Sequence, residues 1–166
     1  MLGRGELNMK RKFFMCLMLI ITMVLTGCVK GYVNQGKYAT DQAAEILRCF
    51  DEKDVSSLKA MFCEKVASTH DLDKEITEAM NLYNGKSVSH DKIQVGGGDT
   101  GYRGVIIDSH VEYLIDNIEM DNGSVYTLAT HSYIIYEKDS SCIGITYLNF
   151  YDDKSQLIIE IGECVK

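Results

Sequence analysis

The amino-acid sequence predicts an α+β domain in which helices come first and an antiparallel sheet follows. Between residues 38 and 85, apolar residues recur at the three- and four-residue spacing of amphipathic helices. After Gly85 they alternate with polar residues, as in strands that bury one face, and the chain has no proline to interrupt them. A block of helices followed by a block of strands favours one sheet wrapped over helices.

Three helices are predicted in the first half of the chain. The first begins at Tyr38, where Thr40 or Asp41 can cap its first turn, and Asp54 and Asp71 are good N-caps for the second and third. The residues expected to face the core are Ala39, Ala43, Ile46, Leu47 and Phe50 in the first helix, Val55, Leu58, Met61 and Phe62 in the second, and Leu72, Ile76, Ala79, Met80 and Tyr83 in the third.

The strands follow Asn84-Gly85, which can end the third helix in a left-handed conformation. They are predicted at residues 105–113, 124–136, 142–151 and 156–164. In the first of them we expect Val105, Ile107, Val111 and Tyr113 to be buried and Asp108, His110 and Glu112 to be solvated. Asp121-Asn122-Gly123 predicts a tight hairpin into 124–136, whose apolar residues on both faces suggest a central strand.

A glycine-rich stretch, VGGGDTGYRG at residues 95–104, precedes these strands. Clustered glycines let backbone amides converge on an anion, but the stretch lacks the Lys-Ser/Thr ending of a phosphate loop, and a strand pattern follows it. We therefore expect a flexible connection between strands, in which Arg103 could still hold a carboxylate.

Residues 1–27 have the pattern of a signal peptide. The cationic cluster Met9-Lys10-Arg11-Lys12 precedes the apolar run Phe13 to Leu25, whose 13 residues are fewer than the roughly 20 that span a bilayer. Met9 is a second candidate start of the protein, and residues 1–8 are left out of the fold prediction. Because basic residues stay on the cytoplasmic side, the chain is expected to be exported.

The run ends in Leu25-Thr26-Gly27-Cys28, which resembles a bacterial lipobox. The resemblance implies cleavage between Gly27 and Cys28 and a diacylglyceryl group on the Cys28 thiol. Two acyl chains suffice for stable anchoring. We therefore expect a lipid-anchored protein on the outer face of the cytoplasmic membrane, with a tether at residues 28–37 and one domain at 38–166. The alternative is an ordinary signal peptide with an incidental cysteine.

The charge of the chain limits its partners. Without residues 1–27, which carry four of the 17 basic and one of the 24 acidic residues, the formal charge is −10. Such a charge repels nucleic acids and anionic lipid surfaces. We expect the membrane to be met through the lipid and no nucleic acid to be bound.

Four cysteines remain after Cys16 and Cys28 are assigned to the signal peptide and the anchor: Cys49, Cys63, Cys142 and Cys164. Their spacing matches no zinc motif, so no metal site and no cofactor are expected. We expect four free thiols in the core, and the alternative is one disulfide between Cys142 and Cys164.

The histidines are the groups able to exchange protons near neutral pH. His70-Asp71 and His90-Asp91 are sequence neighbours, and such neighbours usually point apart. The candidate acid-base site is His131 with Tyr113 or Tyr133, although no inward-facing carboxylate completes it.

Three segments carry a resemblance to a known fold family: CFDEKDVSSLKAMFCEKV at 49–66, LDKEITEAMNLYNGK and IGITYLNF. The first is similar to the helical opening of nuclear transport factor 2-like domains, with Phe50, Asp54, Leu58 and Phe62 at the recurrent positions. The chain resembles an uncharacterised family of Gram-positive lipoproteins with that fold, also described as cystatin-like. This resemblance implies a curved sheet around a conical pocket, and it implies no activity.

Two functions remain open from the sequence. The first is a non-catalytic lipoprotein that binds a small molecule or a protein in or around the pocket of its domain. The alternative is a pocket enzyme with proton-transfer or hydrolytic chemistry. A filled interior would favour the first function, and convergent polar groups at an apolar pocket base would favour the second.

Overall fold

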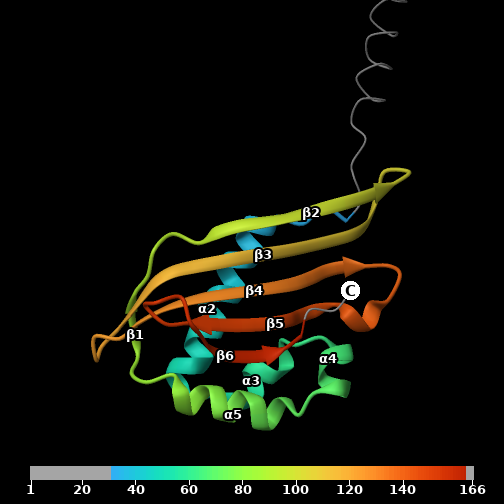
Figure 1. The fold of residues 1–166 in the computed structure, drawn as a ribbon. Coiled ribbons are helices and arrows are strands. Elements are labelled where there is room, and N and C mark those ends of the chain that lie inside the picture. Colours follow the sequence, from blue (N-terminus) through green and yellow to red (C-terminus); the bar gives the residue numbers. More distant parts are fainter. Residues whose placement is uncertain (1–30, 164–166) are drawn as a thin grey trace, which may run out of the picture. The chain divides into compact units, whose positions relative to one another are not determined.

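A computed structural model describes residues 31–163 (Figure 1). Helices come first and a curved, open antiparallel sheet follows, as predicted. The helices are α2 (Gln35–Glu52), α3 (Val55–Ala60), α4 (Glu64–Thr69) and α5 (Leu72–Leu82). The strands are β1 (Ser87–Ser89), β2 (Gln94–Tyr102), β3 (Val105–Met120), β4 (Val125–Tyr136), β5 (Gly144–Tyr151) and β6 (Leu157–Gly162), with the short 3₁₀ helix η1 (Ser140–Cys142) before β5.

The long strands form an antiparallel meander. β3, β4, β5 and β6 are hydrogen-bonded in sequence order, and β1 and β2 both pair with β3 at the other edge. The β3–β4 connection is the predicted hairpin, in which Gly123 has a φ of 84°. β4 lies between β3 and β5, which confirms the prediction of a central strand.

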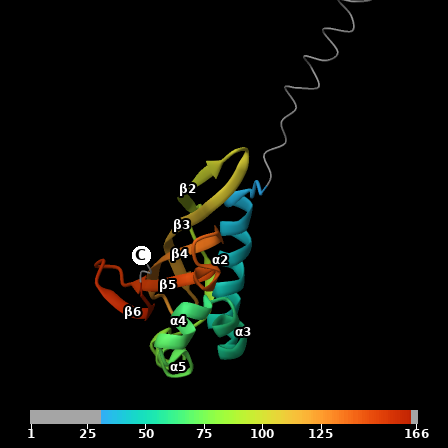
Figure 2. The ribbon, with the colours of Figure 1, turned by 90° about the vertical axis from the view of Figure 1, so that its right-hand side faces the viewer.

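The helices cover one face of the sheet and its β6 edge. α2 lies along one face, and α5 lies beside β6, where Glu75 Oε2 accepts a hydrogen bond from the Gly162 amide (Figures 1 and 2). Asp54 and Asp71 cap α3 and α5 as predicted. The cap of α2 was predicted wrongly, because Asn34 accepts the amide hydrogen bond and the helix starts at Gln35. Helix α4 was not predicted, since its N-cap makes no side-chain bond.

The space between α2 and the sheet is filled by side chains. Phe50, Tyr83 and Phe150 are fully buried, and their ring centroids lie 4.8 to 5.4 Å apart. The largest other fully buried side chains are Ile46, Leu58, Leu72, Ile76, Ile115, Ile118, Leu128, Ile145 and Leu148. Phe62, at 7% exposure, also belongs to this core. The helix-to-sheet core therefore lies where the sequence predicts it.

The glycine-rich stretch is an edge strand, so the expectation of a flexible connection was wrong. β2 pairs with β3 from Gln94 to Tyr102, and a two-residue turn at Arg103-Gly104 joins the two strands. Gly97 has a φ of 143°, and a Cβ there would lie 2.4 Å from the carbonyl oxygen of His110. Only glycine allows the two backbones to come this close at residue 97. This explains why β2 contains glycines, although glycine normally weakens a strand.

The predicted alternation of buried and exposed residues in β3 was wrong over its first three residues. The register shifts between Thr100 and Gly101 of β2, so that Ile106 is buried while Val105 and Ile107 are not. Val111 and Tyr113 are buried as predicted. One extra residue on one strand of a pair moves the following side chains to the other face. The predicted start of the next-to-last strand at Cys142 also moved, since Ser140–Cys142 is helical.

The signal peptide, the lipobox and Cys28 lie outside the described residues, as does Cys164.

Candidate functional site

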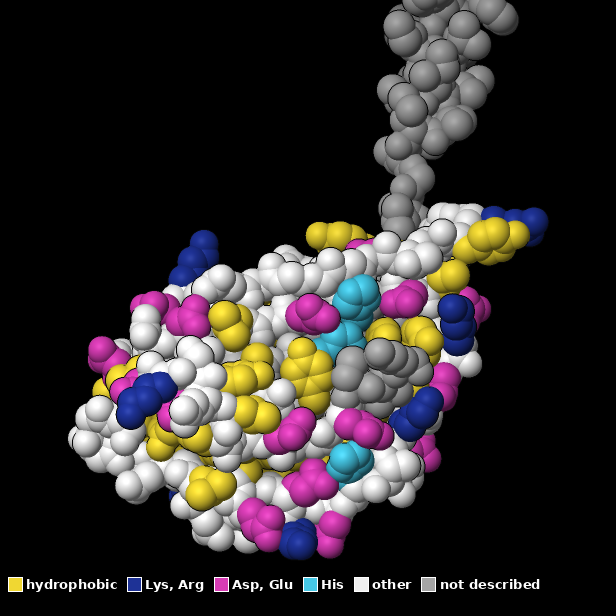
Figure 3. All heavy atoms as spheres, viewed as in Figure 1, with side chains coloured by type: hydrophobic (Ala, Val, Ile, Leu, Met, Phe, Trp, Pro, Cys, Tyr) yellow, Lys and Arg dark blue, Asp and Glu magenta, His cyan; other side chains and the backbone are white. Residues whose placement is uncertain are grey.

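The side chains that could carry chemistry gather on the face of the sheet that α2 does not cover, called here the open face. Cross-strand pairing places Glu112 of β3 opposite His131 of β4, and His131 opposite Tyr147 of β5. His110 lies opposite Tyr133 in the neighbouring row. Figure 3 shows histidine side chains on this face beside acidic and apolar ones.

His131 is held in place by a hydroxyl from the next strand. Its Nδ1 lies 2.7 Å from Thr146 Oγ1, and the side chain is only 6% exposed. The pairing of β4 with β5 shifts between His131 and Ser132, and Thr146 is the extra residue on β5. Bulges of this kind re-aim a side chain, which here brings the hydroxyl to the imidazole.

Two contacts of Thr146 favour one tautomer of His131. Thr146 Oγ1 also lies 3.4 Å from the carbonyl oxygen of His131, to which it can donate its proton. Both bonds are satisfied when Nδ1 carries the ring proton and Nε2 keeps the lone pair. Burial lowers the pKa of His131, and nearby Glu112 opposes this shift. Burial thus favours the neutral form of the ring.

Aromatic rings surround His131 on the open face. His110 and Tyr147 stack on either side of it, with centroid distances of 5.7 and 6.0 Å and interplanar angles of 28° and 15°. Tyr133 meets it edge-on at 4.9 Å and stacks on Tyr136 at 4.5 Å. Three neighbouring strands therefore present a ladder of rings.

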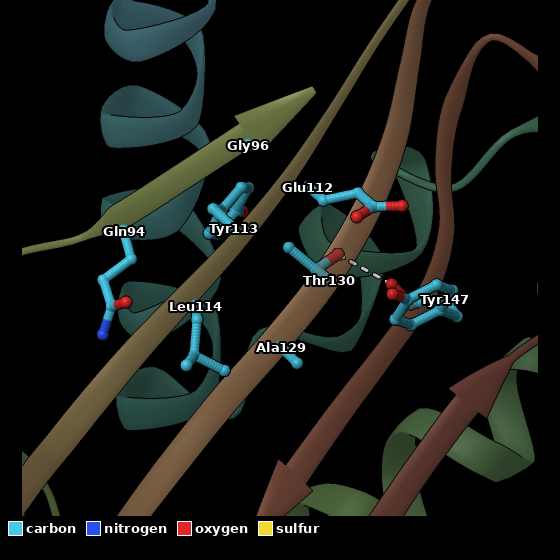
Figure 4. Close-up of a pocket in the computed structure, with 8 residues that line it drawn as sticks. All are labelled: Gln94, Gly96, Glu112, Tyr113, Leu114, Ala129, Thr130 and Tyr147. Carbon is cyan, nitrogen blue, oxygen red and sulfur yellow. Dashed lines mark hydrogen bonds between the residues drawn. The ribbon is translucent and has the colours of Figure 1, made fainter. Parts of the chain in front are cut away.

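A hollow of about 260 Å³ lies beside this ladder. It is lined by Gln94, Gly96, Glu112, Tyr113, Leu114, Ala129, Thr130 and Tyr147. Glu112 extends from β3 over β4, and Gly96 leaves the β2 side without a side chain (Figure 4). We call it the central hollow.

A second hollow, of about 370 Å³, lies at the other end of the ladder. It is lined by Thr100, Ile107, Asp108, Tyr136, Glu137 and Lys138. Asp108 Oδ1 is buried without a hydrogen-bond partner and lies 3.6 Å from His110 Nδ1. The ladder thus runs between two hollows, each with a carboxylate in its lining.

Tyr113 lines the central hollow, but its hydroxyl does not join this group. Its hydroxyl is buried on the helix side and lies 3.2 Å from Gln42 Oε1, which also accepts a hydrogen bond from Ser132. Gln42 in turn donates to the Tyr38 hydroxyl. Of the two tyrosines named from the sequence, the structure therefore brings Tyr133 to His131 and places Tyr113 in a satisfied polar network of the interior.

The remaining histidines do not pair with the carboxylates next to them in the sequence. His70 Nδ1 lies 2.8 Å from Glu75 Oε1, four residues beyond its neighbour Asp71, and His90 Nδ1 lies 2.7 Å from the carbonyl oxygen of Asp91. His70 precedes α5 and Glu75 lies in the first turn of that helix, so their spacing of five residues could have indicated this pair. Among residues 31–163, no group of three or more histidine, cysteine or acidic side chains is placed to hold a metal ion.

The described cysteines are buried thiols. Cys49, Cys63 and Cys142 are free and at most 1% exposed. Burial raises the pKa of Cys49 to about 11, which makes its thiolate rare at neutral pH. These three cysteines are core residues, as predicted.

A family model, the domain of unknown function DUF5104, matches residues 45–153. The chain belongs to this family. The match spans α2 from Glu45 to the end of β5, so it includes His110, His131 and Thr146 of the open face. A comparison with curated proteins gave no match. In the part of the chain that the structure describes, no helix of this DUF5104 protein is long and apolar enough to cross a membrane.

Proposed function

We propose that this DUF5104 protein is an extracytoplasmic lipoprotein, anchored through a diacylglyceryl group on Cys28 to the outer face of a Gram-positive cytoplasmic membrane. The lipobox-like Leu25-Thr26-Gly27-Cys28 and the short apolar run before it support the anchor. We also propose kinship with nuclear transport factor 2-like domains, which the order of helices and curved sheet supports.

The domain, in this proposal, is a non-catalytic binding module whose ligand or protein partner sits on the open face. The observation that carries this is the ladder of rings between two hollows on the open face, whereas side chains fill the space between α2 and the sheet. A further hollow of about 330 Å³, at Tyr38, Asp41, Gln42 and Met61, has no such ladder beside it. Tyrosine and histidine rings supply contact area with little conformational entropy to lose, and the carboxylates of Asp108 and Glu112 supply hydrogen-bond acceptors.

The anchor is tested by replacing Cys28 with alanine. The native chain should incorporate a fatty-acid probe and fractionate with membranes, and the Cys28→Ala variant should do neither. Continued labelling of the variant would contradict the assignment of Cys28.

The binding face is tested by site-specific photo-crosslinking in cells. A photoreactive residue at Glu112, in the central hollow, should give adducts with a partner. The matched control is Glu78 on α5, an exposed acidic residue on another element. Adducts from position 78 and none from position 112 would place the binding surface elsewhere.

A second candidate function is proton-transfer or hydrolytic catalysis, which the neutral, oriented imidazole of His131 favours. A general base needs a lone pair that faces its substrate and a pKa near the working pH. If a substrate is found, His131→Gln should lower turnover roughly a hundredfold or more, since general bases contribute factors of about that size. In the binding module the same variant should keep most of its partner affinity.

A further inference from the structure

The hairpin of β2 and β3 ends in an exposed tip, residues Tyr102 to Val105. Tyr102 and Val105 are cross-strand partners on either side of the turn, and they are 60% and 43% exposed. Arg103 and Gly104 between them have φ values of 50° and 76°, as a two-residue hairpin turn requires. The tip therefore holds a tyrosine and a valine outside the core.

Arg103 makes this tip amphipathic. Its guanidinium carbon lies 5.1 Å from the centroid of the Tyr102 ring, which keeps the cation and the ring together. The tip thus combines an aromatic ring, an aliphatic side chain and a cation, the combination found where proteins meet the water–lipid interface.

The first described residues of the chain lie against the base of this tip. A Cβ on Gly31 would lie 3.5 Å from the side chains of Ile106 and Ile135, and Ile106 directly follows Val105. The next residue, Tyr32, is 72% exposed, more than any other large hydrophobic side chain between residues 31 and 163. Figures 1 and 2 both show the start of α2 at the same end of the domain as the β2–β3 turn.

We propose that the hairpin tip, together with Tyr32, docks on the lipid bilayer and fixes the orientation of the domain. The inference rests on the proposed lipidation of Cys28. Cys28 is three residues from Gly31, and three residues span at most about 11 Å. A lipid on Cys28 therefore brings the bilayer surface within reach of Tyr32, Tyr102 and Val105.

The charge of the chain decides which kind of lipid surface the tip meets. A formal charge of −10 after removal of residues 1–27 disfavours docking that depends on anionic lipids. Tyr102, Val105 and Tyr32 can instead enter the interface of a zwitterionic bilayer, with Arg103 reaching the phosphates. Docking through the tip leaves the central hollow, farther along the strands, uncovered.

The absence of tryptophan from the sequence makes the test direct. The full chain carrying Tyr102→Trp is purified with its lipid and reconstituted into phosphatidylcholine vesicles with or without brominated acyl chains. We expect its fluorescence to shift to the blue on reconstitution and to be quenched by the brominated lipid. The matched control is Leu82→Trp, 59% exposed at the end of α5, which should show neither change.

Each other outcome overturns the proposal. Water-like, unquenched emission from Tyr102→Trp in a chain whose mass shows the lipid would overturn docking and leave the anchor intact. Absence of the lipid mass would overturn the anchor and the docking together. A blue shift that persists in detergent and grows with protein concentration would assign the tip to contact with a second copy of the chain. Equal quenching of both variants would mean that the tip has no special place at the bilayer.

Discussion

The two faces of the sheet are made by alternate residues of the same strands, yet they differ in chemistry. On β4, Leu128 and Ser132 face α2, where one packs in the core and the other donates to Gln42. Ala129 and His131 face the other way, toward the central hollow and the ring ladder. One strand therefore stabilises the fold with one set of side chains and presents titratable groups with the other.

The difference follows from the cost of burying polar groups. In the interior, Gln42 links Tyr38, Tyr113 and Ser132 into a network whose members all have partners. Within the described residues, three buried side-chain atoms have no hydrogen-bond partner. Asp108 Oδ1 and Asn149 Oδ1 lie on the open face, and the third, Ser109 Oγ, belongs to the fully buried residue next to Asp108 on β3. Each unpaired buried polar atom costs free energy, and two of the three lie on the face where we place binding.

The largest expected effect comes from opening the filled interior. Phe50→Ala removes a ring that contacts Tyr83 and Phe150, and should lower the free energy of unfolding by about 3 to 5 kcal/mol. Leu114→Ala, in the lining of the central hollow, should lower it by less than half as much. Denaturant titration of both variants measures the difference, and equal losses would contradict the assignment of the two faces.

A smaller effect is expected at the glycines of β2, the edge strand that pairs with β3. Gly97→Ala forces a Cβ onto the carbonyl oxygen of His110 and should lower the free energy of unfolding by about 1 to 3 kcal/mol. Gly98→Ala is the control, since its Cβ would lie 3.4 Å from the His110 ring and its φ is ordinary. If thermal melting shows the two variants to be alike, the position of β2 against β3 is wrong.

Removal of one interior hydroxyl should have a milder effect. Tyr113→Phe deletes the hydrogen bond to Gln42 Oε1, which keeps Ser132 as a partner, and should lower the free energy of unfolding by about 0.5 to 1.5 kcal/mol. The variant should leave open-face crosslinking at position 112 unchanged. A loss of adducts with little loss of stability would move Tyr113 into the functional site.

The smallest effect concerns pH. Because burial lowers the pKa of His131 in the folded state, the unfolded chain binds a proton first as the pH falls below about 6.5. The free energy of unfolding contributed by His131 is therefore present above that pH and is lost below it. His131→Gln should lose less stability between pH 7 and pH 5 than the native chain. Identical profiles in chemical denaturation would show that the ring is solvated.

Local signals explain how much of the fold was predictable. Asp54 and Asp71 each cap a helix through their own side chains, and Asp121-Asn122-Gly123 forms a hairpin between neighbouring residues. The need for glycine in β2 and the bulge near Ile107 depend instead on how closely β2 and β3 approach each other. No local pattern of residues contains that information.

The candidate site was predictable to a similar extent. Alternation along one strand correctly places His131 and Tyr133 on the same face. Thr146 reaches His131 because β5 has a bulge at this residue. The side chain of Tyr113 lies on the opposite face of the sheet, where its hydroxyl contacts Gln42 of α2. Contacts across strands decide both outcomes, and the register of those strands could not be predicted from the sequence.

The most direct test of the central claim, that binding belongs to the open face and packing to the interior, is crosslinking from a photoreactive residue at Leu114 in two backgrounds. The account predicts that Glu112→Gln lowers the adduct yield several-fold, whereas Tyr113→Phe leaves it unchanged, with both backgrounds folded by circular dichroism. A yield that falls with Tyr113→Phe and survives Glu112→Gln would contradict it.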